Sequence, residues 1–275
     1  MGFDFAKAIK ASEARGKKAV VEAVILGCSG SGKSAAAGSF GVKTLYLRTN
    51  GEKHGPVSAQ TYGKSDIVDI NIERDDSGTD LSADSSLARV IEILGDVSGI
   101  QSAGFKAVVL DGATELEAII RKTSAYKKMC LTNKGEHNSF LESTAVSTIF
   151  RDVTNKLRAL ADESIHYAVT CILDVKELAD NGEIEAAAPR ISTYSCAESL
   201  IQQFGDVLVV GKMLKDDTTD YRFQFGAGVS KVSKDQAGRI KKTLNYSPRI
   251  TGVEVNFNSM KAKLSEVIKL KEGKK

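Results

Sequence analysis

The sequence has no tryptophan, only three prolines and three histidines, and aromatic residues make up 6% of its 275 positions. Any surface on which nucleic-acid bases stack must therefore come from Tyr, Phe or Arg. The four cysteines are far apart, without a Cys-x-x-Cys pair or a nearby histidine, at Cys28, Cys130, Cys171 and Cys196. This spacing argues against a zinc site or a disulfide scaffold and is typical of a reducing compartment.

Long hydrophobic runs are also missing. No segment is long enough to cross a bilayer, and the N-terminus lacks the pattern of a signal peptide. After Met1-Gly2, position 6 is Ala6, where a myristoylation motif requires Ser or Thr. We therefore expect a cytoplasmic protein with no membrane partner.

The net charge of +3 is small, but it is unevenly distributed. Residues 240–275 contain nine Lys or Arg against three Glu, a local charge of +6, which leaves the remainder near −3. A basic end of this kind indicates either a contact with nucleic acid or a solvated helical end. Charge alone does not separate these two interpretations.

The most informative stretch runs from Val21 to Ser34. Residues 27–34, Gly-Cys-Ser-Gly-Ser-Gly-Lys-Ser, match the phosphate-binding pattern G-x-x-x-x-G-K-[ST]. An apolar run that favours a strand precedes the motif, and an alanine-rich run that favours a helix follows it. Glycines at this turn allow the chain to bend sharply and to direct backbone N–H groups inward, where they bind phosphate together with the helix N-terminus.

Each residue type in the motif has a chemical part. Lys33 is expected to reach the β- and γ-phosphates of ATP, and the Ser34 hydroxyl to bind Mg²⁺. The predicted nucleotide-binding residues are consecutive: Gly27, Cys28, Ser29, Gly30, Ser31, Gly32, Lys33, Ser34 and Ala35.

A second landmark is Phe105-Lys-Ala-Val-Val-Leu-Asp111. A buried parallel strand that ends in a carboxylate is the Walker B pattern. Asp111 is expected to hold Mg²⁺ through its water shell, opposite Ser34.

The remaining pattern alternates strands and helices, which predicts an α/β fold with a mostly parallel sheet flanked by helices. Further strands are expected near 43–48, 67–72, 165–172, 207–210 and 250–257, and helices over 86–94, 114–126, 143–161 and 259–270. Residues 207–225 read as an antiparallel hairpin. We expect a nucleotide-binding core over 1–240, including an N-terminal helix within 1–17, and a basic strand–helix extension over 241–275.

The chain resembles the RecA-like P-loop ATPases, and most closely the phage-encoded ATP-binding proteins that include RecA-like single-strand annealing proteins. The likeness covers about residues 18–240. It rests on the motif at 25–34 and on weaker blocks at 44–47, 108–112, 204–209 and 232–239. Only the first block is specific.

One departure from the family's pattern concerns the acid that orients the attacking water. In the family the second strand ends in a Thr-Glu-Gly-like sequence, whereas this chain has Arg48-Thr-Asn50-Gly-Glu52. Asn50 stands at the expected position and can hold a water but cannot accept its proton. Either Glu52 takes the role, or hydrolysis is slow or absent.

The resemblance also implies a polar residue that senses the γ-phosphate, and basic residues that reach a neighbouring subunit's nucleotide. Thr170 is the candidate sensor, with Asp174 or Lys176 as substitutes. Lys234 and Arg239 are the candidates that act across a homo-oligomer interface; otherwise they are solvated loop charges.

Three functions remain open. The first is an ATPase acting on single-stranded DNA in phage-type recombination or replication, in the host cytoplasm, assembled as a ring or filament. The second is a nucleotide-binding structural or regulatory protein with weak or no hydrolysis, as the Asn50 departure suggests. The third is a small-molecule kinase, against which the single acid at Asp111 and the lack of an Arg-rich lid count. A GTPase is disfavoured because no N-K-x-D guanine signature occurs.

Overall fold

The structure is a computed structural model. It describes residues 20–63, 65–178, 184–191, 206–215, 218–225, 227–234, 240–247, 255–256 and 264–271. The expected N-terminal helix, Arg239 and most of the expected strand over 250–257 lie outside these residues.

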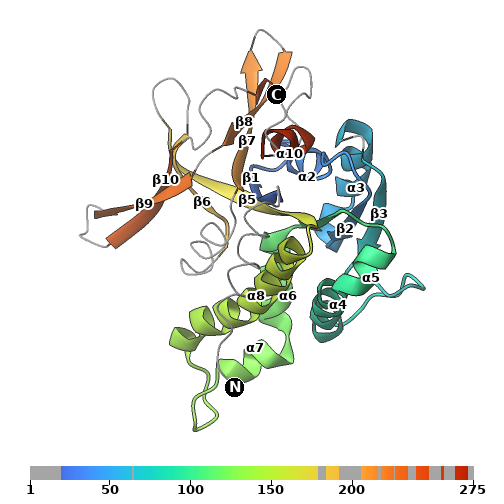
Figure 1. Cartoon of the computed structure of the whole chain (residues 1–275). Coiled ribbons are helices and arrows are strands. Elements are labelled where there is room, and N and C mark those ends of the chain that lie inside the picture. Colours follow the sequence, from blue (N-terminus) through green and yellow to red (C-terminus); the bar gives the residue numbers. More distant parts are fainter. Residues whose placement is uncertain are drawn as a thin grey trace, which may run out of the picture.

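The main sheet of the described part has the strand order β11-β8-β7-β1-β5-β4-β2-β3 (Figure 1). The strands from β7 to β3 run parallel, and β8 and β11 are antiparallel to their neighbours. In chain order the bounds are β1 Glu22–Gly27, β2 Thr44–Arg48, β3 Ile67–Asn71, β4 Ala107–Asp111, β5 His166–Leu178, β7 Asp206–Lys215, β8 Thr218–Phe225 and β11 Val255–Asn256. The predicted parallel sheet and the predicted hairpin of β7 with β8 are confirmed.

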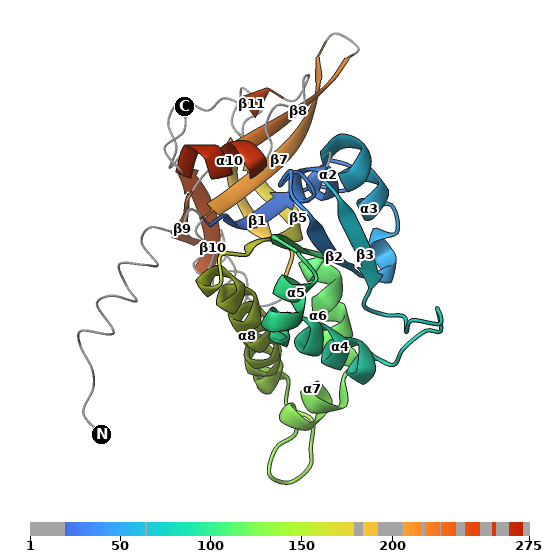
Figure 2. The same cartoon turned by 45° about the vertical axis from the view of Figure 1, so that its right-hand side comes forward.

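Helices cover both faces of this sheet (Figures 1 and 2). Their bounds are α2 Lys33–Ala37, α3 Gly55–Ser58, α4 Ala83–Gly95, α5 Val97–Ser102, α6 Ala113–Lys122, α7 Ser124–Met129, α8 Ser139–Asp162 and α10 Leu264–Lys271. Short helical turns also occur at Asn50–Glu52 and Ala59–Gly63. Within the described chain, none of the helices combines the length and hydrophobicity that crossing a bilayer requires.

Two hydrophobic cores lie on opposite faces of the sheet. Along β1, Val24 and Leu26 join the core under α4, α6 and α8, whereas Ala23 and Ile25 join the core under α2 and α10. Successive side chains of a strand point to opposite faces, so a strand buried on both sides is apolar throughout. This explains the uninterrupted apolar run before the phosphate-binding motif.

The strand β5 is long enough to serve two sheets. Beyond the main sheet it pairs antiparallel with β6 Ile184–Pro189, which pairs with β10 Ile240–Ser247, itself paired with β9 Ala227–Lys234. This second sheet projects to one side of the molecule (Figure 1).

The expected helix over 114–126 is two helices, because Thr123 is extended and caps the second. Its hydroxyl accepts a hydrogen bond from the Tyr126 N–H at 3.2 Å and donates to the Ile120 carbonyl at 2.7 Å. The sequence pattern did not predict helix α5. Helix α10 overlaps the helix expected over 259–270 and ends one residue later.

Candidate phosphate-binding site

The phosphate-binding motif forms the turn between β1 and α2, at the carboxyl edge of the parallel strands. Gly30 and Gly32 have φ of 74° and 92°, in the left-handed region that favours glycine. A Cβ added at Gly30 would meet no heavy atom within 4 Å, so glycine is needed here for its backbone angle rather than for room. Cys28, Ser29 and Gly30 are exposed, which leaves this stretch of the turn accessible to a ligand.

Two side chains of the turn are buried and polar. Lys33 is only 7% exposed, and its Nζ donates to the Cys28 carbonyl oxygen at 3.0 Å. The Ser31 hydroxyl is buried and has no hydrogen-bond partner within the described residues. Buried polar groups are normally paired, so an unpaired hydroxyl in a glycine-rich turn fits a phosphate oxygen.

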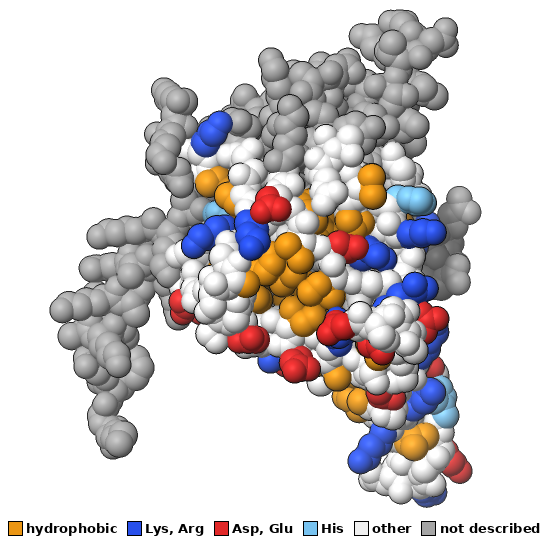
Figure 3. All heavy atoms as spheres, turned by 90° about the vertical axis from the view of Figure 1, so that its right-hand side faces the viewer, with side chains coloured by type: hydrophobic (Ala, Val, Ile, Leu, Met, Phe, Trp, Pro, Cys, Tyr) orange, Lys and Arg blue, Asp and Glu red, His pale blue; other side chains and the backbone are white. Residues whose placement is uncertain are grey.

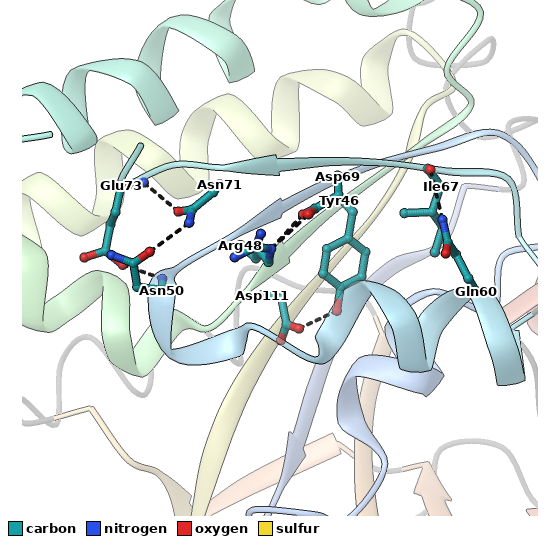
Figure 4. Close-up of polar contacts among 9 residues, drawn as sticks. All are labelled: Tyr46, Arg48, Asn50, Gln60, Ile67, Asp69, Asn71, Glu73 and Asp111. Carbon is teal, nitrogen blue, oxygen red and sulfur yellow. Dashed lines mark hydrogen bonds and ion pairs between the residues drawn. The ribbon is translucent and has the colours of Figure 1, made fainter. Parts of the chain in front are cut away.

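Asp111 ends β4 with a fully buried carboxylate. Its Oδ2 accepts a hydrogen bond from the Tyr46 hydroxyl (Figure 4), and its Oδ1 accepts one from the Thr170 hydroxyl. Burial, and then the charge of Asp111, raise the pKa of Tyr46 well above its ordinary value. The phenol therefore remains a donor, and the two hydroxyls fix the orientation of the carboxylate.

Ser34 and Asp111 converge beside Gly55, the first residue of α3. A Cβ added at Gly55 would lie 2.4 Å from Asp111 Oδ2 and 3.4 Å from Ser34 Oγ. A hydroxyl and a carboxylate are oxygen ligands of the kind that Mg²⁺ prefers, so these residues fit that ion. Within the described chain, no group of three His, Cys, Asp or Glu side chains could hold a metal ion. Phosphate and water oxygens would have to complete the shell.

Asn50 lies away from this carboxylate. Its side-chain oxygen accepts a hydrogen bond from Asn71 Nδ2 at 2.8 Å, and its backbone N–H donates to Glu73 Oε2 at 2.5 Å. Figure 4 shows this group at the end of β3, apart from the pair of Tyr46 and Asp111. The Asn50 amide is therefore engaged with the edge strand.

Glu52 stands in a different environment, in the turn that follows β2. The pKa of this half-buried carboxyl is raised from 4.5 to about 7, chiefly by burial and then by the charges of Asp111 and Glu115, while the charge of Lys33 opposes the rise. Glu52 is thus close enough to Lys33 and Asp111 to be influenced by both. A carboxyl with a pKa near the working pH suits a general base.

The other predicted residues are placed less completely. Thr170 lies opposite Asp111 in the register of β4 and β5 and donates to it. Only the backbone is described for Asp174 and Lys176 in β5, and for Lys234 at the end of β9. Their roles, like those of Glu52 and Asn50, stay predictions.

Three residues near the site were not predicted from the sequence: Tyr46, Thr49 and Glu115. Tyr46 had a signal, since a hydroxyl in an otherwise apolar, buried strand needs a partner. Glu115, in the first turn of α6, resembles an ordinary acid at a helix N-terminus. Thr49 matches the Thr of the family's Thr-Glu-Gly-like sequence, but nothing in the sequence indicates that its hydroxyl is buried.

The strand order and the phosphate-binding turn together define the class: the chain has the α/β fold of RecA-like P-loop NTPases. No protein-family model matches the sequence, and comparison with curated proteins gives no match. Among solved structures, the chain is similar to a KaiC-like protein from the hyperthermophilic archaeon Pyrococcus horikoshii OT3. The TM-score is 0.40 at 10% identity, over 82% of this chain and 90% of the other. The fold assignment rests on the topology and not on this likeness.

Proposed function

We propose that this protein is a P-loop ATPase that binds Mg–ATP and couples its hydrolysis to work on single-stranded DNA. The observation that carries the nucleotide part is the convergence of the Lys33 turn, Ser34 and Asp111 at one edge of the sheet. Lys33 would leave the Cys28 carbonyl for the phosphates, and Ser34 and the waters of Asp111 would hold Mg²⁺. When bound, this ion neutralises the charge on the phosphate oxygens. Glu52 would take the proton of the attacking water.

The DNA part is supported by the end of the molecule formed by α7, the start of α8 and the loop between them. Phe140, at the start of α8, is 89% exposed, and Leu131 is 44% exposed. Exposed lysines lie nearby in the chain at Lys127, Lys128 and Lys134. Figure 3 shows hydrophobic, basic and histidine side chains together with some acidic ones at this narrow end. Aromatic stacking with basic side chains is how sequence-tolerant proteins hold single strands.

Assembly is part of the proposal, with the nucleotide at an interface between copies that Lys234 and Arg239 reach. A charge supplied by a neighbouring copy stabilises the transition state of phosphoryl transfer. Light scattering with and without Mg–ATP measures the assembly. A protein that remains monomeric with ATP and DNA present would contradict this part.

The test of the function is ATP hydrolysis with and without single-stranded DNA, using Lys33→Ala as the inactive control. We expect DNA to stimulate phosphate release, and Lys33→Ala to abolish it. Phe140→Ala should weaken DNA binding about 10-fold, the effect of one lost base stack, without changing stability. Binding of ATP without turnover, together with no DNA retention at low salt, would refute the proposal. Phosphoryl transfer to a nucleoside monophosphate would indicate a kinase instead.

Two observations favour the second candidate, a nucleotide-binding regulatory protein with weak hydrolysis. Asn50 is bonded to the edge strand, and the pKa of Glu52, about 7, leaves much of this carboxyl protonated at neutral pH. A base that is about half protonated at pH 7 works at about half of the rate that it reaches when fully ionised. Turnover that is slow at pH 7 and rises toward pH 8.5 would fit an ATPase with Glu52 as base. Turnover that stays absent across this range would favour the regulatory protein.

A further inference from the structure

Two buried polar atoms beside the candidate site have no hydrogen-bond partner within the described residues: Thr49 Oγ1 and Glu115 Oε2. Thr49 is completely buried, at 0% exposure. A Cβ added at Gly51 would lie 3.8 Å from Thr49 Oγ1 and 3.3 Å from Glu115 Cγ, so both side chains border this one residue. Since buried polar atoms are normally paired, each of these two atoms calls for a polar partner that the described residues do not supply.

Glu115 also meets Glu52. A Cβ added at Gly112 would lie 2.2 Å from Glu115 Oε2 and 3.4 Å from Glu52 Cγ, so the two glutamates pack over the same glycine. Gly112 directly follows Asp111 and has a φ of 149°, in the region that favours glycine. The turn from β4 into α6 thus brings a second acid next to the candidate base.

The charges around Thr49 and Glu115 limit which kind of ligand could bond to their unpaired oxygens. Asp111, Glu52 and Glu115 are acids, and Lys33 is the cation that acts on Glu52. An anion bound directly to Glu115 would be repelled by its carboxylate. A water molecule, by contrast, can donate to a carboxylate and bond to a hydroxyl at the same time.

We infer that Glu115 is a further catalytic residue, which together with Thr49 holds the water that Glu52 deprotonates; this rests on the proposed ATPase function. The water oxygen bonds to the γ-phosphorus while the bond from that phosphorus to the bridging oxygen breaks. The electron pair leaves with ADP, and the proton passes to Glu52 and then to solvent. Glu115 and Thr49 are unchanged by the cycle, because they only orient the water.

A structural role for Glu115 makes different predictions. An acid in the first turn of α6 would stabilise the helix, so its removal would lower the melting temperature. A carboxylate kept unpaired for a water costs stability instead, so its conversion to an amide should leave the melting temperature unchanged or raise it. The two roles therefore differ in the sign of the stability change.

The experiment compares Glu115→Gln and Thr49→Val with Glu92→Gln, a control that changes an exposed glutamate of α4. Steady-state hydrolysis gives kcat and KM, a fluorescent non-hydrolysable ATP analogue gives affinity, and thermal unfolding gives stability. We expect Glu115→Gln to lower kcat at least about 10-fold, in the range of a lost transition-state contact, with KM within about 3-fold. Thr49→Val should lower kcat less, Thr49→Ser should restore it, and Glu92→Gln should match the original protein.

The double variant tests whether the two residues hold one water. The effects of substituting two residues that hold the same group are not additive. The double variant Glu115→Gln with Thr49→Val should therefore lose less kcat than the product of the two single losses. Three results for Glu115→Gln would overturn the inference. They are an unchanged kcat, an affinity for the analogue that falls as much as kcat does, and a lower melting temperature that accompanies the loss of kcat. Thr49→Val, close in shape to the original, decides the matter if Glu115→Gln does not fold. An original protein that binds ATP without turnover refutes the ATPase proposal and the inference together, whereas turnover unaffected by both variants refutes the inference alone.

Discussion

The ionised carboxylate of Glu52 should destabilise the folded protein, and Glu52→Gln should remove this destabilisation. Its pKa rises from 4.5 to about 7 on folding, chiefly because the carboxyl is desolvated, and then because Asp111 and Glu115 repel its charge. A rise of this size corresponds to about 3 kcal/mol if the group were fully buried. Because Glu52 is half-buried, solvent screening reduces the expected effect to about 1–2 kcal/mol.

The sign follows from proton binding. A folded state with the higher pKa holds the proton more tightly than the unfolded chain, so the two states bind protons equally below pH 4.5 and above about pH 7, and differently between. The stability contributed by Glu52 therefore falls as the pH rises from about 4.5 to about 7, and stays low above that. The Gln variant lacks this dependence.

Urea and thermal unfolding of the nucleotide-free protein in EDTA, at pH 5 and pH 8, measure the difference. At pH 8, Glu52→Gln should be more stable by about 1–2 kcal/mol, or roughly 2–6 °C in melting temperature. Near pH 5 the gain should largely disappear. The exposed control Glu92→Gln should change stability by less than about 0.5 kcal/mol at either pH. A gain in stability that is equal at both pH values, or a loss of stability at pH 8, would show that Glu52 is neither desolvated nor repelled by Asp111 and Glu115.

Three further predictions concern the site and its support. Cys28 is the exposed cysteine of the phosphate-binding turn, so Mg–ATP should slow its alkylation by N-ethylmaleimide at least about 10-fold. Peptide mass spectrometry measures this rate, and equal rates with and without Mg–ATP would refute nucleotide binding at the turn. Gly55→Ala places a methyl 2.4 Å from Asp111 Oδ2, so the Mg²⁺-dependent affinity for ATP should fall about 10-fold or more. The control Ser58→Ala, in the same short helix, should keep the original affinity. Equal affinities of the two variants would contradict the placement of Gly55. Leu264 is 1% exposed in the core under α2, and Leu264→Ala should cost about 2–4 kcal/mol in urea unfolding, whereas a cost below about 1 kcal/mol would mean that α10 does not dock there.

The docking of α10 shows what pattern reading leaves out. The Leu264 N–H donates to Ser39 Oγ at 2.9 Å, and the Ser265 N–H donates to the Ser39 carbonyl at 3.1 Å. These residues are more than two hundred positions apart, so no local pattern joins them. The amphipathic pattern predicted a helix near the C-terminus but gave no indication of which surface it covers.

The sequence by itself determined the phosphate-binding turn, the strand that ends in Asp111 and the parallel α/β architecture. These features are local: glycines at fixed spacing allow a turn with positive φ, and an uninterrupted apolar run requires burial on both faces. The strand that separates β1 from β4, by contrast, is β5, which follows both of them in the chain. Only the tertiary structure decided that Thr170 and Tyr46 hold Asp111, that Asn50 turns to the edge strand, and that Glu115 meets Glu52 over Gly112. Those contacts join side chains from separate strands and turns, and their distances depend on how the whole sheet packs, which no single stretch of sequence specifies.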